Sequence, residues 1–266
     1  MSNTFKKLNM VFATPIPVYE IEDFKRINAE ILKEIDDRIK GEAGMVRSNR
    51  SGWHSDLDFF RRKEPAHKEL AQKIMQCLAD ATQRVANKEA LKNLRLECDG
   101  WVNVNPKGGY NVPHDHPGAF WSAAYYVKVP PAVTGEVAGS IEFIDHRSAP
   151  PGQGLVKSPY MRSLHTMRPT PGTLVVFPST LKHWVHPNDA DEDRITIAIN
   201  AKIAVDPAKM KAAQTEAAHE SNRQVPGLNA PAGQAPKPPA TAKAPATTKA
   251  PAKSKAAPKR KAPVKA

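Results

Sequence analysis

The sequence predicts a mainly β fold of the α+β class, in which two amphipathic helices pack on the outside of an antiparallel barrel or sandwich. Two observations lead to this prediction. Helical periodicity is clearest before residue 86, and from Leu94 onward the chain consists of short runs rich in β-branched and aromatic residues. Gly, Pro, Asn and Asp clusters separate these runs, as is typical of antiparallel strands joined by turns.

Apolar residues recur at steps of three or four in two segments of the N-terminal part. The first predicted helix follows Asp23, a suitable N-cap, and ends at Gly41. The second begins at about Pro65, because proline is favoured at the first helical position, and continues to Val85. The Pro-containing segment 10–21 predicts an edge strand, and the polar, aperiodic segment 44–60 predicts a loop.

Five later runs predict strands, and the composition changes again after them. The runs are "LRLECDGWVNVN", "FWSAAYYVKV", "GSIEFIDH", "GTLVVF" and "RITIAINAKIAV". We therefore expect one domain over residues 1–205 and a helix or linker over 206–225. Residues 226–266, which are rich in Ala, Pro and Lys, have too few apolar side chains to offset the entropy of ordering and should form a disordered tail.

The formal charge of +12 is unevenly distributed, because eight Lys and one Arg but no acid lie in residues 226–266. The basic tail resembles the arms of linker-histone-like proteins, and it predicts either nonspecific nucleic-acid contact or a solubilising extension. The two cysteines, Cys77 and Cys98, form no CxxC motif. The chain has no apolar run of the roughly 18 residues that would cross a bilayer. A cytoplasmic protein without a membrane partner is therefore expected.

Candidate metal ligands lie in "NPKGGYNVPHDHPGAF", residues 105–120. In an extended chain His114 and His116 project on the same face and can reach one ion, whereas Asp115 points the other way. A second stretch, residues 171–200, predicts a hairpin-like unit in which His183 and His186 compete for a third ligand position. Three imidazoles with open positions suit Fe(II), with Mn, Co or Ni as alternatives.

These motifs resemble those of the 2-oxoglutarate- and Fe(II)-dependent dioxygenases, especially the prolyl-hydroxylase-like branch and a bacterial and phage subgroup of it. "NPKGGYNVPHDH" resembles the segment that carries the family's HxD motif, and "GTLVVFPSTLKHWVHP" resembles the strand and loop that carry the distal histidine. The resemblance covers about residues 10–204. It implies a double-stranded β-helix, or jelly roll, with Fe(II) and 2-oxoglutarate as cofactors, and it selects His183 over His186.

The same resemblance implies roles for further residues. Arg194 would bind the distal carboxylate of 2-oxoglutarate, and Thr196 would add a hydroxyl donor. Asn103, Tyr110 and Tyr126 would line the co-substrate pocket, because strands that flank the iron do so in this fold. No catalytic residue is expected beyond the metal centre, and Trp101, Trp121 and Trp184 are interpreted as packing residues.

The sequence departs from the family at one ligand position, where His116 replaces the usual Asp. The predicted triad is therefore His114, His116 and His183, with Asp115 as a ligand only if a bulge reverses the alternation. The leading hypothesis is an oxygenase that hydroxylates or otherwise oxidises a small-molecule or protein substrate. The alternative is a cupin-like metal-binding β-barrel module without 2-oxoglutarate turnover. Loops 41–63 and 145–170 are expected to shape the substrate pocket.

Overall fold

The computed structural model describes residues 5–7, 11–86 and 93–207. The chain divides into two units, Met1–His219 and Glu220–Ala266, and all described residues belong to the first. Apart from residues 206 and 207, the predicted linker and tail lie outside the described residues. No helix among the described residues is long and apolar enough to span a membrane.

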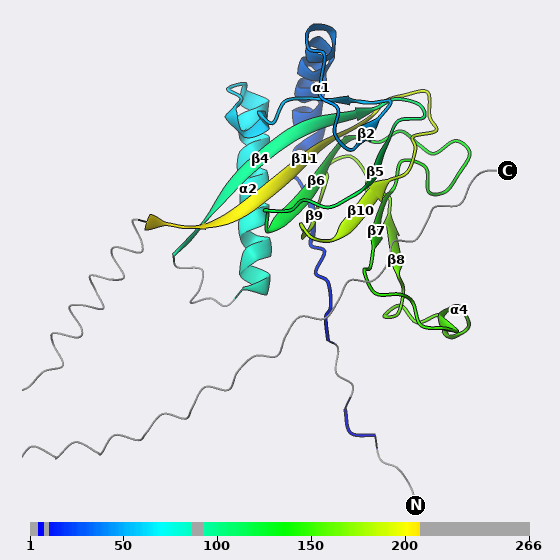
Figure 1. Cartoon of the computed structure of the whole chain (residues 1–266). Helices are drawn as coiled ribbons and strands as arrows, with labels where there is room; N and C mark the ends of the chain where they lie inside the picture. The colour runs from blue at the N-terminus through cyan, green and yellow to red at the C-terminus, as the bar shows by residue number, and fades with distance from the viewer. Residues whose placement is uncertain (1–4, 8–10, 87–92, 208–266) are drawn as a thin grey trace, which may run out of the picture. The chain divides into compact units, whose positions relative to one another are not determined.

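The larger sheet has six antiparallel strands that carry most of the predicted β runs. Their order is β1 (Val18–Glu20), β9 (Thr173–Pro178), β6 (Trp121–Lys128), β11 (Arg194–Val205), β4 (Leu94–Asn105) and β3 (Trp53–His54). Strands β4 and β11 pair along their whole length and lie side by side in Figure 1. The predicted edge strand in segment 10–21 forms as β1, directly after Pro17, and lies at an edge of the sheet.

The smaller sheet has five antiparallel strands and faces the larger one. Their order is β2 (Asn49–Arg50), β5 (Tyr110–His114), β10 (Lys182–Val185), β7 (Ile141–Ile144) and β8 (Leu164–Met167). Side chains from β6, β7 and β9 form a small apolar cluster between the sheets, made of Tyr126, Ile141, Phe143, Val175 and Phe177. The two sheets together form the predicted jelly-roll barrel.

Both predicted helices form where expected, as α1 (Phe24–Gly41) and α2 (Pro65–Val85). Their apolar faces pack against the larger sheet in the main core (Figure 1). Three buried hydrogen bonds tie the helices to β6: Trp121 Nε1 donates to Thr82 Oγ1 at 3.0 Å, the Tyr125 hydroxyl donates to Asn28 Oδ1 at 2.6 Å, and Asn28 Nδ2 donates to the Val127 carbonyl oxygen at 2.9 Å. Asp23 precedes α1 as predicted, but its side chain makes no capping hydrogen bond.

Two local predictions were wrong. The segment predicted as a loop contains β2, β3 and a short 3₁₀ helix, η1 (Phe59–Arg61). Strands β9 and β11 do not form a hairpin-like unit, because β6 lies between them and His183 lies on β10 in the other sheet. In both cases the strands form by pairing with strands that are distant in the sequence. The local spacing of apolar residues does not reveal such pairing. The loop after β7 also carries a short helix, α4 (Gln153–Val156).

Candidate metal centre and co-substrate cavity

Two neighbouring strands of the smaller sheet bring three imidazoles together. His183 on β10 lies opposite His114 at the end of β5, and His116 follows two residues later. The ring centroids are 4.5 Å apart for His114 and His183, 4.9 Å for His114 and His116, and 5.2 Å for His116 and His183. One nitrogen from each ring lies within 4.8 Å of the others. Small side-chain rotations would therefore bring all three to a common ion at about 2.1 Å.

Backbone carbonyls orient two of the rings. His114 Nδ1 lies 2.6 Å from the Val112 carbonyl oxygen, and His183 Nδ1 lies 2.9 Å from the Leu181 carbonyl oxygen. Because a carbonyl can only accept, both Nδ1 atoms are the donors and both Nε2 atoms keep a free lone pair. Backbone partners of this kind orient histidine ligands in metal sites.

The three imidazoles are neutral at physiological pH. Burial is the main cause that lowers the pKa of each ring, and the neighbouring His114 contributes to the shift of the other two. The pKa of His116 falls to about 4 and that of His183 to about 3. Neutral imidazole is the form that binds a metal ion.

The neighbouring candidate ligands face elsewhere. Asp115 is exposed and lines a different hollow with Thr180 and Lys182. His186 Nε2 lies 3.5 Å from a Glu142 carboxylate oxygen. Among the described residues, neither belongs to the group of donor atoms that contains His183.

A small cavity beside the triad collects most of the predicted co-substrate residues. Thr196 on β11 pairs with Asn103 on β4 and with Tyr126 on β6, so these three lie in one row across the larger sheet. All three line the cavity with the triad and with Arg194, the first residue of β11. The larger sheet thus supplies the polar wall and the smaller sheet supplies the imidazoles.

Tyr110 is not among the residues that line this cavity, and Asn111 takes its place. The register between β5 and β10 shifts between the His114–His183 pair and the Asn111–Val185 pair. A β-bulge of this kind reverses the alternation, so Asn111 faces inward with His114. Tyr110 was expected to line the pocket because its strand flanks the metal centre, and such an expectation does not register the bulge. Asn111 Nδ2 donates to Ser48 Oγ at 3.2 Å.

The Arg194 guanidinium is buried without an acidic partner. The residue is 2% exposed, and its Nε donates to the Gly139 carbonyl oxygen at 2.8 Å. Its central carbon lies 5.2 Å from the centroid of the Tyr126 ring. Among the described residues no carboxylate forms an ion pair with it, and burial lowers its pKa. A buried cation without a counter-charge is costly, so the site favours an anionic ligand.

Two polar atoms on the cavity wall also have no hydrogen-bond partner among the described residues. These are the Tyr126 hydroxyl and Asn103 Oδ1, and both are buried. Burial raises the pKa of Tyr126, which keeps the phenol protonated as a donor. The cavity therefore offers a cation, a hydroxyl donor and an amide to a polar ligand.

Sequence reasoning also missed an aromatic stack beside the triad. His54 on β3 stacks on Trp101 with ring centroids 5.4 Å apart, and Trp101 lies 5.8 Å from His116. Trp101 lines the cavity, whereas Trp121 packs in the main core as predicted. The sequence contains no local signal that would separate these two tryptophans.

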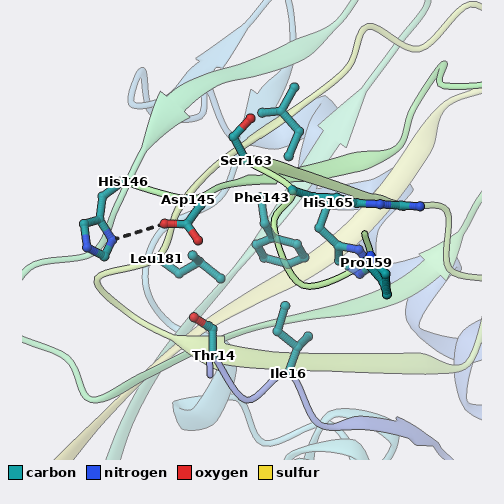
Figure 2. A pocket seen from close by; sticks show the side chains of 11 residues that line it. Thr14, Ile16, Phe143, Asp145, His146, Pro159, Ser163, His165 and Leu181 are labelled. Carbon is teal, nitrogen blue, oxygen red and sulfur yellow. Dashed lines mark ion pairs between the residues drawn. The ribbon is translucent and has the colours of Figure 1, made fainter. Parts of the chain in front are cut away.

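A larger hollow of about 440 Å³ borders the metal centre through Phe143. Figure 2 shows the Phe143 ring between Leu181 and His165. The Phe143 ring centroid lies 6.1 Å from that of His183 and 6.3 Å from that of His165. Residues from Asp145 to His165 line much of this hollow, so the predicted pocket-forming role of loop 145–170 agrees with its position.

Comparison with known proteins identifies the class. Residues 99–200 match the model of a family described as "Putative 2OG-Fe(II) oxygenase". This part of the chain is similar to the 2OG-Fe(II) oxygenases, a class of oxidoreductases, and the family description names both 2-oxoglutarate and Fe(II). No curated protein matches the chain.

Solved structures agree on the fold. SnoN, a non-heme alpha-ketoglutarate-dependent epimerase from nogalamycin biosynthesis, is 15% identical with a TM-score of 0.50, over 71% of this chain and 79% of that one. HygX from Streptomyces hygroscopicus, with nickel, 2-oxoglutarate and hygromycin B bound, is 13% identical with a TM-score of 0.50, over 71% and 83%. A Pseudomonas putida prolyl-4-hydroxylase is 15% identical with a TM-score of 0.49, over 70% and 91%. The first two support the double-stranded β-helix predicted from the sequence.

Proposed function

We propose that this protein hydroxylates or otherwise oxidises a substrate with Fe(II) held by His114, His116 and His183 and with 2-oxoglutarate held by Arg194. The substrate would occupy the hollow of Figure 2, whose Phe143 ring lies 6.1 Å from that of His183. When bound, Fe(II) and 2-oxoglutarate supply the activation of dioxygen and the two electrons that complete its reduction. The protein itself supplies ligand geometry, anion recognition and the exclusion of water.

The unpaired, buried guanidinium of Arg194 is the observation that carries this proposal. A planar guanidinium can hold a carboxylate by two parallel hydrogen bonds. Arg194 lies at the start of β11 and shares the cavity with the triad. One end of a dicarboxylate could therefore bind Arg194 while its other end reaches the metal.

The neighbouring polar residues fit the same ligand. The Thr196 and Tyr126 hydroxyl groups can donate to the carboxylate that Arg194 holds, and the Asn103 amide can orient it. The cavity has a free volume of about 40 Å³, far below the roughly 300 Å³ of ordinary ligand pockets. Side chains on the cavity wall must therefore move when 2-oxoglutarate enters.

The three imidazoles of the triad are suitable donors for Fe(II), but the set has no carboxylate and so differs in charge from the family's usual ligands. Imidazole nitrogens are suitable ligands for iron, and the three rings are neutral because of their burial. Without a carboxylate ligand, the centre keeps one more positive charge than the family's usual site. This charge strengthens the attraction for a doubly negative co-substrate.

Anaerobic calorimetry with Mn(II) in place of Fe(II) tests the proposal. The wild-type protein should bind 2-oxoglutarate, and Arg194→Gln should weaken binding by about 100-fold, because a charge-assisted hydrogen-bond pair is lost. Lys202→Gln is the matched control, since Lys202 is an exposed cation on the same strand. The Fe(II)-loaded protein should also release succinate when a substrate is present.

Equal affinity of the wild-type protein and Arg194→Gln for 2-oxoglutarate would contradict the assigned carboxylate site. Metal binding by the wild-type protein with no affinity for 2-oxoglutarate would instead support a metal-binding module without turnover.

A further inference from the structure

A second group of side chains that could bind a metal ion, one buried and two half-buried, lies at the junction of the two helices. Glu34 is on α1, Glu64 is the N-cap residue of α2, and His67 is in the first turn of α2. One ligand atom from each lies within 4.8 Å of the others. His67 is 1% exposed, whereas the side chains of Glu34 and Glu64 are 26% and 38% exposed and leave a path from solvent.

The buried polar atoms of this region are poorly satisfied. Ten buried side-chain atoms among the described residues have no hydrogen-bond partner, and six of them lie here: Glu34 Oε2, Arg38 Nη1, Arg62 Nε, Glu64 Oε2, His67 Nδ1 and His67 Nε2. Each such atom costs about 1–3 kcal/mol if it stays unpaired. Concentration of most of them at one place indicates a ligand that would satisfy them.

The contact between His67 and Glu34 does not account for these atoms. His67 Nδ1 lies 2.7 Å from Glu34 Oε2, yet the two atoms are not aligned as a hydrogen bond. A tetrahedral ion bonded to both atoms at about 2.0–2.1 Å would hold them about 3.3 Å apart. The two side chains would therefore move apart by less than about 1 Å when the ion binds.

The charged side chains around this group carry more negative charge than positive charge. Arg38 pairs with Glu42 at 2.9 Å and with Asp58 at 3.2 Å. Arg62 pairs with Asp58 at 3.2 Å and with Glu64 at 2.8 Å. With Glu34, four carboxylates face two guanidinium groups, so two negative charges are left when His67 is neutral. A divalent cation would balance them.

The protonation states of the group are those of a metal site. Burial, and then the charge of Arg62, lowers the pKa of His67 to about 4, so the imidazole is neutral at physiological pH. Burial, and then the nearby Glu64 carboxylate, raises the pKa of Glu34. A cation between the two carboxylates would relieve this repulsion.

We propose that Glu34, Glu64 and His67 bind a second divalent ion, Zn²⁺ or one of similar size, which clamps α1 to the start of α2. One imidazole and two carboxylates, with a water at the fourth position, form a suitable tetrahedral set for Zn²⁺. Mg²⁺ and Ca²⁺ prefer sets made of oxygen alone, so His67 disfavours both. The site lies on the helices and does not share a ligand with the histidine triad on the smaller sheet.

The metal content of the whole chain tests this site directly. After saturation with Zn²⁺ and gel filtration, the wild-type protein should retain two ions per chain, and Glu34→Gln/Glu64→Gln should retain one. Glu30→Gln is the matched control, because Glu30 lies one turn earlier on α1 and pairs with Arg26 at the surface. The control should retain two ions. Equal retention by the wild-type protein and by Glu34→Gln/Glu64→Gln would overturn the proposal.

A chain without the triad isolates the second site. In His114→Ala/His116→Ala/His183→Ala, one equivalent of Co²⁺ should produce a d–d absorption band, and Zn²⁺ should raise the melting temperature. Both effects should disappear when Glu34→Gln and Glu64→Gln are added. If the group were a plain His–Glu contact or held only buried water, the triad-free chain would show neither effect. Circular dichroism confirms that each variant is folded.

Discussion

Burial controls the chemistry of individual side chains at the triad. His183 is 5% exposed, and burial is the main cause that lowers its pKa to about 3. The buried imidazole therefore stays neutral, the form that can bind a metal ion, where an exposed one would take up protons at mildly acidic pH. In the proposed site, the same burial makes the Arg194 guanidinium favour an anionic partner.

Removal of one triad imidazole should abolish iron binding. His183→Ala leaves two imidazoles, so we expect iron affinity to fall by at least 100-fold when the protein is reconstituted anaerobically. His186→Ala is the control, because His186 lies three residues away and contacts Glu142 rather than the triad. Iron content measured after gel filtration checks the prediction. The same iron content in His183→Ala as in the wild-type protein would refute the triad.

At the scale of elements, one glycine sets how closely the turn before β9 approaches α1. Gly172 has φ +89°, and an added Cβ would lie 2.4 Å from Cγ of Phe24 at the start of α1. Its amide also donates to the Tyr126 carbonyl oxygen at 2.8 Å. The turn can therefore not move away easily to make room for a side chain.

Gly172→Ala should destabilise the fold more than a Gly→Ala substitution at a position where the added Cβ meets no other atom. We expect a loss of about 2–4 kcal/mol in the free energy of unfolding, which combines backbone strain with overpacking against Phe24. Gly152→Ala is the matched control, since Gly152 has φ +82° and nothing within 4 Å of the added Cβ. It should cost only about 1 kcal/mol. Equal losses in urea denaturation would show that the Phe24 contact does not matter.

At the scale of the whole molecule, the buried neutral histidines should make the metal-free protein sensitive to acid. The pKa of His67 is about 4 and that of His183 about 3 in the fold, against about 6.5 in the unfolded chain. As the pH falls below 6.5, the unfolded chain takes up protons that the folded chain does not. The contribution of each such histidine to the free energy of unfolding is therefore fully present above pH 6.5. It decreases toward pH 4 by about 1.4 kcal/mol per pH unit.

Urea denaturation in the presence of EDTA at pH 7, 6 and 5 checks this dependence. His67→Gln should reduce the slope between pH 6 and 5 by about 1.4 kcal/mol per unit, because glutamine does not titrate. His146→Gln, at an exposed position, should leave the slope as it is in the wild-type protein. An unchanged slope in His67→Gln would mean that His67 is protonated in the fold.

The charge of the whole chain leads to a further prediction about residues 225–266, which lie outside the described residues. This segment carries nine of the twelve net positive charges. If the segment contacts nucleic acid, truncation after Gln224 should weaken nonspecific DNA binding and flatten its dependence on salt, because fewer counterions are released. Unchanged DNA affinity and salt dependence after truncation would leave the segment as a solubilising extension.

The sequence by itself determined the class of fold, the two helices and five of the strands, and it predicted most of the polar residues that line the cavity beside the triad. These follow from local causes: apolar spacing defined Phe24–Gly41 and Pro65–Val85 as helices, and the motif resemblance pointed to His114, His183 and Arg194. The tertiary structure decided what depends on pairing between distant segments. The bulge on β5 turned Asn111 rather than Tyr110 inward. Strands β9 and β11 did not form the predicted hairpin-like unit, because β6 lies between them and the segment that carries His183 became β10 of the other sheet. Helix packing likewise brought Glu34 to His67. The sequence did not predict this contact, because the residues of one helix do not show which residue of another helix the fold will place beside them.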